Sequence, residues 1–245
     1  MSQDRVAVVI PSRYASTRFP AKPLAMLCGK PMVQHVYEKA AASSADLTVV
    51  ATDHQAIYNT VVGFGGKAVM TAESHPSGTD RIAEAVSKLG GEVDIIINVQ
   101  GDEPLIPTSV IDELIAIMKC DPSIEMATVA VPGNRATMTE NNVKVVFGED
   151  RFALYFSRSM IPFLRKGGVE APVYLHWGIY AYRRSALERF VSLPPGRLEN
   201  CEKLEQLRAL ENGIRIYVHL SELESIGIDT PEDLVRAEKK LLEGR

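Results

Sequence analysis

The chain has 245 residues, the length of one large α/β domain or of a domain with an appendage. With 46% hydrophobic and 24% charged residues it has a globular composition, which excludes wholesale disorder and a collagen-like fold. The formal net charge of −4 argues against a general nucleic-acid-binding protein, because such proteins carry a strongly basic face.

The first half of the chain alternates between strand and helix patterns. Residues 6–10 form a continuous apolar, β-branched run, typical of a strand covered on both faces in a parallel sheet. The alternation that follows predicts right-handed βαβ crossovers, an α/β fold and a doubly wound, mostly parallel sheet. We predict strands at 6–10, 47–51, 67–71 and 94–99, and helices at 32–42, 54–64, 79–89 and 108–119.

The rhythm changes beyond residue 126, where strand patterns follow one another with few helices between them. We interpret these strands as antiparallel additions to the sheet. A last helix should begin at Pro231, with Asp229 or Thr230 as its N-cap. No linker interrupts the chain, so we predict a single domain over 1–245. The remaining predicted strands are 126–131, 143–147, 153–157, 173–182 and 214–220, and the predicted helices are 184–192 and 199–212.

Location and redox state follow from apolar runs and cysteines. No apolar run approaches the ~20 residues that span a membrane, and the run after residue 5 is too short for an export signal. We therefore expect a cytoplasmic protein without membrane insertion. Cys28, Cys120 and Cys201 lie far apart in the chain without zinc or redox spacing, and we expect unpaired thiols.

The loop after the first strand, residues 11–24, is the first place to look for a ligand, because ligands of open parallel sheets lie beyond the strands' carboxyl ends. Arg13, Arg18 and Lys22 with small residues between them suit a polyphosphate. The alternative is a solvated surface loop. The position of the loop directly after a buried strand favours phosphate binding. The absence of both G-x-x-x-x-G-K-[ST] and a G-x-G-x-x-G after the first strand weakens a kinase, an ATPase or a nicotinamide dehydrogenase.

Two acidic residues are candidate metal ligands. Asp102 follows the fourth strand and could hold Mg²⁺ against phosphates, or it could cap the turn before Pro104. Asp229 could be a second ligand or only a helix N-cap. A basic loop with two acids at the ends of elements is what metal-assisted phosphoryl chemistry needs.

The loop 11–24 resembles the signature loop of sugar nucleotidyltransferases. More narrowly, further blocks resemble, in order and over nearly the whole chain, the family of 3-deoxy-manno-octulosonate (KDO) cytidylyltransferases, or CMP-KDO synthetases. These blocks are residues 98–104, 153–158, 176–182, 204–208 and 229–234.

The resemblance implies a Rossmann-like sheet of the nucleotide-diphospho-sugar transferase type in a homodimer. It also implies Mg²⁺-dependent transfer of CMP from CTP to the anomeric hydroxyl of KDO, which releases pyrophosphate and gives CMP-KDO for lipopolysaccharide synthesis. The implied catalytic residues are Arg13, Lys22, Asp102 and Asp229, with both aspartates on the metal. The implied nucleotide contacts are Pro11, Arg13, Arg18, Lys22, Ser77, Gly78 and Thr79, and the implied sugar contacts are Gln100, Arg158, His176, Tyr180, Glu202, Glu205 and Gln206.

Local patterns leave other readings of the sugar-side residues open. Helical spacing places Glu202, Glu205 and Gln206 on one face of the predicted helix 199–212, opposite leucines, which also describes a solvated face. His176 beside Trp177 could be a packed histidine instead of a ligand contact.

The identity of the sugar acid is also open. Trp177 stands where many relatives have Leu, and the segment 165–172 is shorter than in some, so 8-amino-KDO is an alternative acceptor. A sialic acid is a further alternative, against which the blocks around Arg158 and His176 argue. A non-catalytic nucleotide-binding subunit is disfavoured by the presence of both Asp102 and Asp229.

Overall fold

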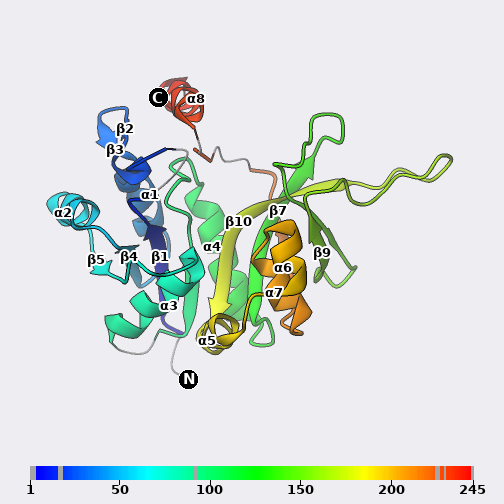
Figure 1. Ribbon diagram of the computed structural model, residues 1–245, viewed down its shortest axis with the longest axis horizontal. Coiled ribbons are helices and arrows are strands. Elements are labelled where there is room, and N and C mark those ends of the chain that lie inside the picture. The colour runs from blue at the N-terminus through cyan, green and yellow to red at the C-terminus, as the bar shows by residue number, and fades with distance from the viewer. Residues whose placement is uncertain (1–3, 16–18, 91–92, 224–226, 229, 244–245) are drawn as a thin grey trace. The chain divides into compact units, whose positions relative to one another are not determined.

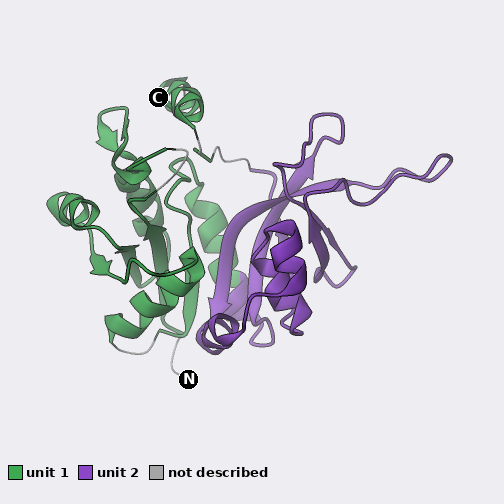
Figure 2. Cartoon of the chain, viewed as in Figure 1, with its two compact units in different colours: residues 1–116, 225–245 green, residues 117–224 purple. Residues whose placement is uncertain are grey.

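The computed structural model describes residues 4–15, 19–90, 93–223, 227–228 and 230–243. The chain divides into two compact units, of which unit 1 comprises residues 1–116 and 225–245 and unit 2 comprises residues 117–224 (Figure 2). The predicted fold class, a mostly parallel α/β sheet with antiparallel additions, is confirmed. That the two units act as one domain stays a prediction.

Unit 1 is built on four parallel strands (Figure 1). Their order is β6 (Ile95–Asn98), β1 (Val6–Ser12), β4 (Leu47–Thr52) and β5 (Ala68–Met70). The first strand therefore lies inside the sheet, and residues 6–10 are fully buried, as the apolar run predicts.

Helices α1 (Met32–Ala41) and α3 (Gly78–Leu89) both pack against β1 and β4. The other elements of unit 1 are η1 (Lys22–Leu24), the hairpin β2 (Met26–Leu27) and β3 (Lys30–Pro31), and helices α2 (Gln55–Gly63), α4 (Thr108–Cys120) and α8 (Pro231–Glu243), of which α4 runs on into unit 2. Thr230 caps α8, because its Oγ1 accepts from the N–H of Asp233 while the Asp233 carboxylate accepts from Thr230. Asp229 lies outside the described residues.

Unit 2 contains the antiparallel additions. Strand β10 (Val173–Arg183) pairs antiparallel with β7 (Met126–Gly133) and β8 (Lys144–Phe147), and β8 pairs antiparallel with β9 (Ala153–Ser157). Strand β11 (Ile216–Leu220) runs parallel to β7. The β10–β7 register shifts between Trp177 and Tyr180. The helices of unit 2 are α5 (Arg184–Ser192), α6 (Arg197–Glu202) and α7 (Gln206–Glu211).

The single helix predicted over 199–212 is wrong, because the chain forms α6 and α7 with a break at Lys203. Lys203 adopts the left-handed conformation with φ of 54°, which ends α6. An ion pair between Glu199 and Arg208, with N···O distances of 2.6 and 2.8 Å, joins the two short helices. Glu202 and Gln206 therefore lie on different helices and share no helical face.

Two further sequence expectations concern cysteines and membranes. The three thiols are unpaired, with Cys28 half-buried and Cys120 and Cys201 exposed, as predicted. Among the described residues, no helix combines the length and hydropathy that crossing a membrane requires.

Candidate active site

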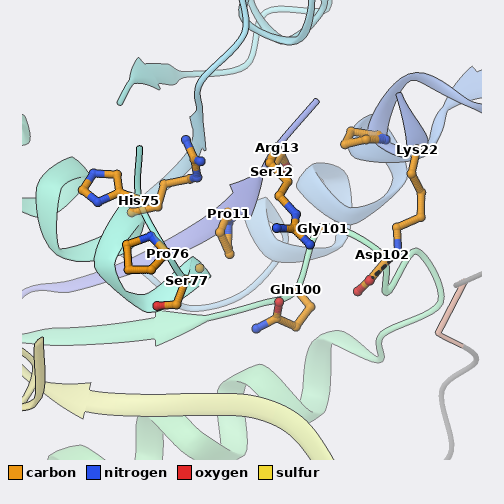
Figure 3. A pocket seen from close by; sticks show the side chains of 13 residues that line it. Pro11, Ser12, Arg13, Lys22, His75, Pro76, Ser77, Gln100, Gly101 and Asp102 are labelled. Atoms are coloured by element: carbon orange, nitrogen blue, oxygen red, sulfur yellow. Dashed lines mark hydrogen bonds and ion pairs between the residues drawn. The ribbon is translucent and has the colours of Figure 1, made fainter. Parts of the chain in front are cut away.

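A cavity of about 390 Å³ lies in unit 1 at the carboxyl ends of β1 and β6 (Figure 3). This is the sheet edge at which open parallel sheets bind ligands. Most of the predicted nucleotide and metal residues of the described chain line it. The lining residues are Pro11, Ser12, Arg13, Lys22, Pro23, His75, Pro76, Ser77, Gly78, Arg81, Gln100, Gly101 and Asp102.

The basic loop supplies two of the cations at this cavity. Arg13 directly follows β1 and is exposed, whereas Lys22 begins the short helix η1 and is half-buried. Lys22 Nζ donates to Asp102 Oδ2 at 2.6 Å and to the carbonyl of Ile228 at 2.8 Å. Figure 3 shows the Lys22 and Asp102 side chains pointing toward each other. Arg18 lies outside the described residues.

Asp102 combines a half-buried carboxylate with a second link to the segment before α8. Its side chain is 33% exposed, and its carbonyl accepts from the N–H of Ile228 at 2.9 Å. A hard carboxylate at a cavity lined by cations fits Mg²⁺, which binds through one or two carboxylates together with substrate phosphates. Within the described ranges, no cluster of three or more His, Cys, Asp and Glu side chains could hold a metal without such phosphates.

The start of α3 forms another wall of the cavity. Ser77 is the N-cap, since its Oγ accepts from the N–H of Asp80 at 3.2 Å. Ser77 and Gly78 line the cavity, so backbone N–H groups of the first helical turn and the positive end of the helix lie beside it. Thr79 is buried and does not line it.

Arg81, one turn further along α3, is a lining residue that the sequence analysis missed. Its guanidinium donates to Asp53 Oδ2 at 2.8 Å, and the two side chains are only 4% and 7% exposed. The other oxygen of Asp53 accepts from the N–H of Tyr14 at 3.1 Å, and the Tyr14 ring stacks on His54 at 3.8 Å. The buried ion pair thus ties α3 to the loop that follows β1. Asp53 follows β4, so the strand-end rule could have found it.

Gly101 and Ser12 were also missed. A Cβ on Gly101 would lie 2.7 Å from Ser12 Oγ and 2.8 Å from the carbonyl of Pro11, so only glycine lets the loop after β6 approach β1 this closely. Ser12 is 2% exposed, and its Oγ has no hydrogen-bond partner in the described residues. Gln100, next to Gly101, lines the cavity and donates to Asn98 Oδ1 at 3.1 Å.

His75, another missed lining residue, is held by Glu84. Hydrogen bonding from Lys88, the largest contribution, and from the N–H of Ala72 and His75 lowers the pKa of Glu84 to about 2, against the opposing effect of burial. Glu84 therefore stays ionised near neutral pH and fixes the segment between β5 and α3.

The other predicted sugar contacts lie in unit 2, where Arg158 and Glu202 form one network. The Glu202 carboxylate accepts from Ser157 Oγ at 2.7 Å and from the N–H of Arg158 at 2.9 Å. Burial alone would raise the pKa of Glu202, but these hydrogen bonds outweigh it and lower the pKa. The Arg158 guanidinium donates to the carbonyls of Glu202, Glu140 and Lys203, at 2.8 to 3.4 Å. Among the described residues, these carbonyls accept from three of the five N–H groups of the guanidinium.

His176 and Tyr180 are neighbours in β10, with ring centroids 5.4 Å apart. Burial lowers the pKa of His176 to about 3 and raises that of the Tyr180 hydroxyl well above its usual value, so both are neutral near pH 7. Gln206 is 6% exposed, and its Nε2 has no partner in the described part of the chain. Glu205 lies 3.7 Å from Arg208. Buried polar groups are normally satisfied, so the free amide of Gln206 suits a ligand contact.

Comparison with known proteins gives the class to which this site belongs. The sequence profile of the cytidylyltransferase family matches residues 7–216, so the chain belongs to the cytidylyltransferase family. A 3-deoxy-manno-octulosonate cytidylyltransferase of Thermodesulfovibrio yellowstonii is 54% identical, over 95% of this chain and 96% of that protein. An 8-amino-3,8-dideoxy-manno-octulosonate cytidylyltransferase of Shewanella sp. (strain ANA-3) is 49% identical, over 96% of this chain and 98% of that protein.

Among solved structures, a CMP:2-keto-3-deoxy-manno-octonic acid synthetase complexed with CTP is 41% identical, with a TM-score of 0.94. The alignment covers 99% of this chain and 100% of that one. The resemblance to KDO cytidylyltransferases inferred from the sequence blocks is thus confirmed, and the chain is a nucleotidyltransferase.

Proposed function

We propose that this protein transfers CMP from CTP to the anomeric hydroxyl of KDO and releases pyrophosphate. The observation that carries the proposal is the cavity of unit 1, where Arg13, Lys22 and Asp102 gather at the carboxyl ends of β1 and β6. The relative named for KDO at 54% identity supports this acceptor. Transfer to 8-amino-KDO is the second candidate, because relatives named for that sugar are 49% identical over nearly equal length.

In this proposal the cations of the first loop hold the triphosphate. The guanidinium of Arg13 can contact two phosphate oxygens at once, and the ammonium of Lys22, which bonds Asp102, adds a second positive charge beside the phosphates. Ser77 and Gly78, which line the cavity, would lie on the cytidine side. Each cation placed on the β- and γ-phosphates stabilises the charge that develops as pyrophosphate leaves.

The sugar's anomeric oxygen would attack the α-phosphorus in line, while the bond from that phosphorus to the β-phosphate oxygen breaks. No protein nucleophile is needed. Bound Mg²⁺, held by Asp102 and Asp229 together with the phosphates, would neutralise phosphate charge and lower the pKa of the attacking hydroxyl. On the sugar, Gln100, Arg158, His176, Tyr180, Glu202, Glu205 and Gln206 are the proposed contacts.

Pyrophosphate release tests nucleotide, acceptor and reaction class together. Each of the four ribonucleoside triphosphates is incubated with Mg²⁺ and with KDO, 8-amino-KDO, a sialic acid or no acceptor. We expect release only with CTP and KDO. Release with 8-amino-KDO alone would transfer the assignment to that sugar, and silence in every combination would refute catalysis.

Asp102 is the sharpest single test of the metal site. Asp102→Ala should abolish turnover with CTP and KDO at all Mg²⁺ concentrations while the chain stays folded. Asp150→Asn is the matched control. The Asp150 side chain is 58% exposed, and its ion pair among the described residues is with Arg215. Near-normal turnover of Asp102→Ala would remove Asp102 from the mechanism.

The remaining features of the proposal are a homodimer, a cytoplasmic location and a role in lipopolysaccharide synthesis. The segment between β9 and β10 projects from the rest of unit 2 (Figure 1). It favours self-association, since Phe163 is 85% and Val169 is 95% exposed. Large exposed apolar side chains grouped on one segment are typical of a surface that contacts another protein. Light scattering of the purified protein tests the dimer directly.

A further inference from the structure

Thr128 in β7 is a buried residue that no sequence motif singled out. Its side chain is 0% exposed, and its Oγ1 lies 2.7 Å from the carbonyl oxygen of Ile179, 3.0 Å from His176 Nε2 and 3.3 Å from the carbonyl oxygen of Trp177. All three partners belong to β10, around the register shift between Trp177 and Tyr180. The hydroxyl therefore lies where β10 departs from regular pairing.

The number of hydrogens on this hydroxyl decides the direction of each bond. A threonine hydroxyl carries one hydrogen and can accept two bonds, whereas a carbonyl oxygen can only accept. Ile179 O is the nearest carbonyl, so it takes the single hydrogen of Thr128. The oxygen of Thr128 can then only accept from His176, which requires the hydrogen of the imidazole to be on Nε2.

The other nitrogen of His176 is then left as an acceptor. Burial lowers the pKa of His176 to about 3, so the ring is neutral near pH 7 and Nδ1 carries no hydrogen. Within the described residues Nδ1 makes no hydrogen bond. The half-buried ring stands between Phe156, at 5.0 Å and edge-on, and Tyr180, at 5.4 Å, which restrict its rotation.

We propose that Thr128 is a positioning residue, which fixes His176 as the Nε2–H tautomer and thereby presents Nδ1 as the acceptor for a hydroxyl hydrogen of the sugar acid. This rests on the proposed function, in which His176 contacts the sugar. If Thr128 had only a structural role, its bond to the carbonyl of Ile179 would stabilise β10 at the register shift. It would then control neither the tautomer of His176 nor the affinity for the sugar.

Two measurements separate these roles. The first is ¹⁵N NMR of the histidine-labelled protein, which reports the tautomer of each of its five histidines, with His176 assigned by its loss in His176→Asn. The second is steady-state kinetics of pyrophosphate release for Thr128→Val, which keeps the shape but lacks the hydroxyl. Thr128→Ser, which keeps the hydroxyl, is the matched control.

We expect the Nε2–H tautomer in the wild type and a mixture of the two neutral tautomers in Thr128→Val, because no bond then fixes the hydrogen on Nε2. The KM for KDO should rise about 10-fold in Thr128→Val, as for a lost hydrogen bond, with the KM for CTP within 2-fold of wild type. Thr128→Ser should restore both readouts. Because Thr128 acts through the imidazole, Thr128→Val should add nothing to the KM for KDO when His176 is already Asn.

An Nδ1–H tautomer of His176 in the wild-type spectrum would overturn the proposal by itself, even if Thr128→Val failed to fold. An unchanged KM for KDO in a folded Thr128→Val, or an equal rise in the His176→Asn background, would also overturn it. Failure of every acceptor to support pyrophosphate release refutes the proposed function and the sugar role with it, while the spectrum still decides the tautomer.

Discussion

Breaking the buried ion pair between Asp53 and Arg81, which joins α3 to the loop after β1 at the cavity of unit 1, should destabilise the protein. The side chains are 7% and 4% exposed and 2.8 Å apart, so neither charge can be solvated when its partner is lost. Removing one member of such a pair costs about 3–5 kcal/mol. At about 2–4 °C per kcal/mol for a chain of this size, Arg81→Met should lower the Tm by roughly 6–20 °C.

The double variant distinguishes an unpaired charge from lost packing. Asp53→Asn with Arg81→Met leaves no buried charge, and the Asn oxygen can still accept from the N–H of Tyr14. The double variant should therefore be more stable than the sum of the single effects by at least about 2 kcal/mol. Its KM for CTP should still exceed the wild-type value, because the ion pair no longer ties α3 to the loop after β1, where we propose that the triphosphate binds.

Thermal unfolding followed by far-ultraviolet circular dichroism, together with CTP saturation curves, measures both effects. Asp150→Asn at the exposed Asp150–Arg215 pair is the control, with an expected loss below about 1 kcal/mol. Single variants at Asp53 and Arg81 that lose as little as this control, or a double variant that equals their sum, would refute the reasoning.

Three further predictions concern a glycine, a carboxylate and a lysine. Gly101→Ala should raise the KM for CTP at least 10-fold, because its Cβ would displace the Pro11 backbone, whereas Gly63→Ala, with nothing within 4 Å, should match wild type in the same assay. Glu84→Gln should lower the free energy of unfolding by about 1 kcal/mol at pH 7. Because the pKa of Glu84 is lowered to about 2 in the folded protein, the difference between wild type and variant should shrink below about pH 5 and vanish near pH 2, which thermal unfolding measures. Lys144→Met should lower the free energy of unfolding in urea by about 2 kcal/mol, because Lys144 is 1% exposed and its ammonium donates to the carbonyls of Thr139, Asn142 and Arg158. A decrease below about 0.5 kcal/mol would contradict this role.

The sequence predicted most of the fold because local pattern and burial agree in the βαβ part. The run 6–10 is apolar on both faces and is buried on both faces. The failure at 199–212 has a different origin, since the left-handed Lys203 is stabilised by contacts distant in the chain. Glu202 bonds Ser157 and Arg158, 45 and 44 residues away, and no periodicity within the segment contains that information.

The same distinction separates the site residues that were found from those that were missed. Arg13, Lys22 and Asp102 follow strands or lie in the loop after one, so the position of the strand predicts them. Arg81 lies inside a helix, where the sequence alone predicts a solvated side chain. Gly101 lies in a polar turn, where the sequence alone predicts a flexible residue. Their roles depend on Asp53 and Ser12, which the fold brings next to them.

The two interpretations of His176, as a packed histidine and as a ligand contact, support each other. Burial keeps the imidazole neutral, and the hydrogen bond with Thr128 consumes one nitrogen, so the second nitrogen has a single defined state. A solvent-exposed histidine would exchange between tautomers and protonation states near neutral pH, and it would present an acceptor for only part of the time. Packing around a histidine that we propose to contact the sugar is therefore the condition for a fixed hydrogen-bond acceptor, and it is no evidence against binding.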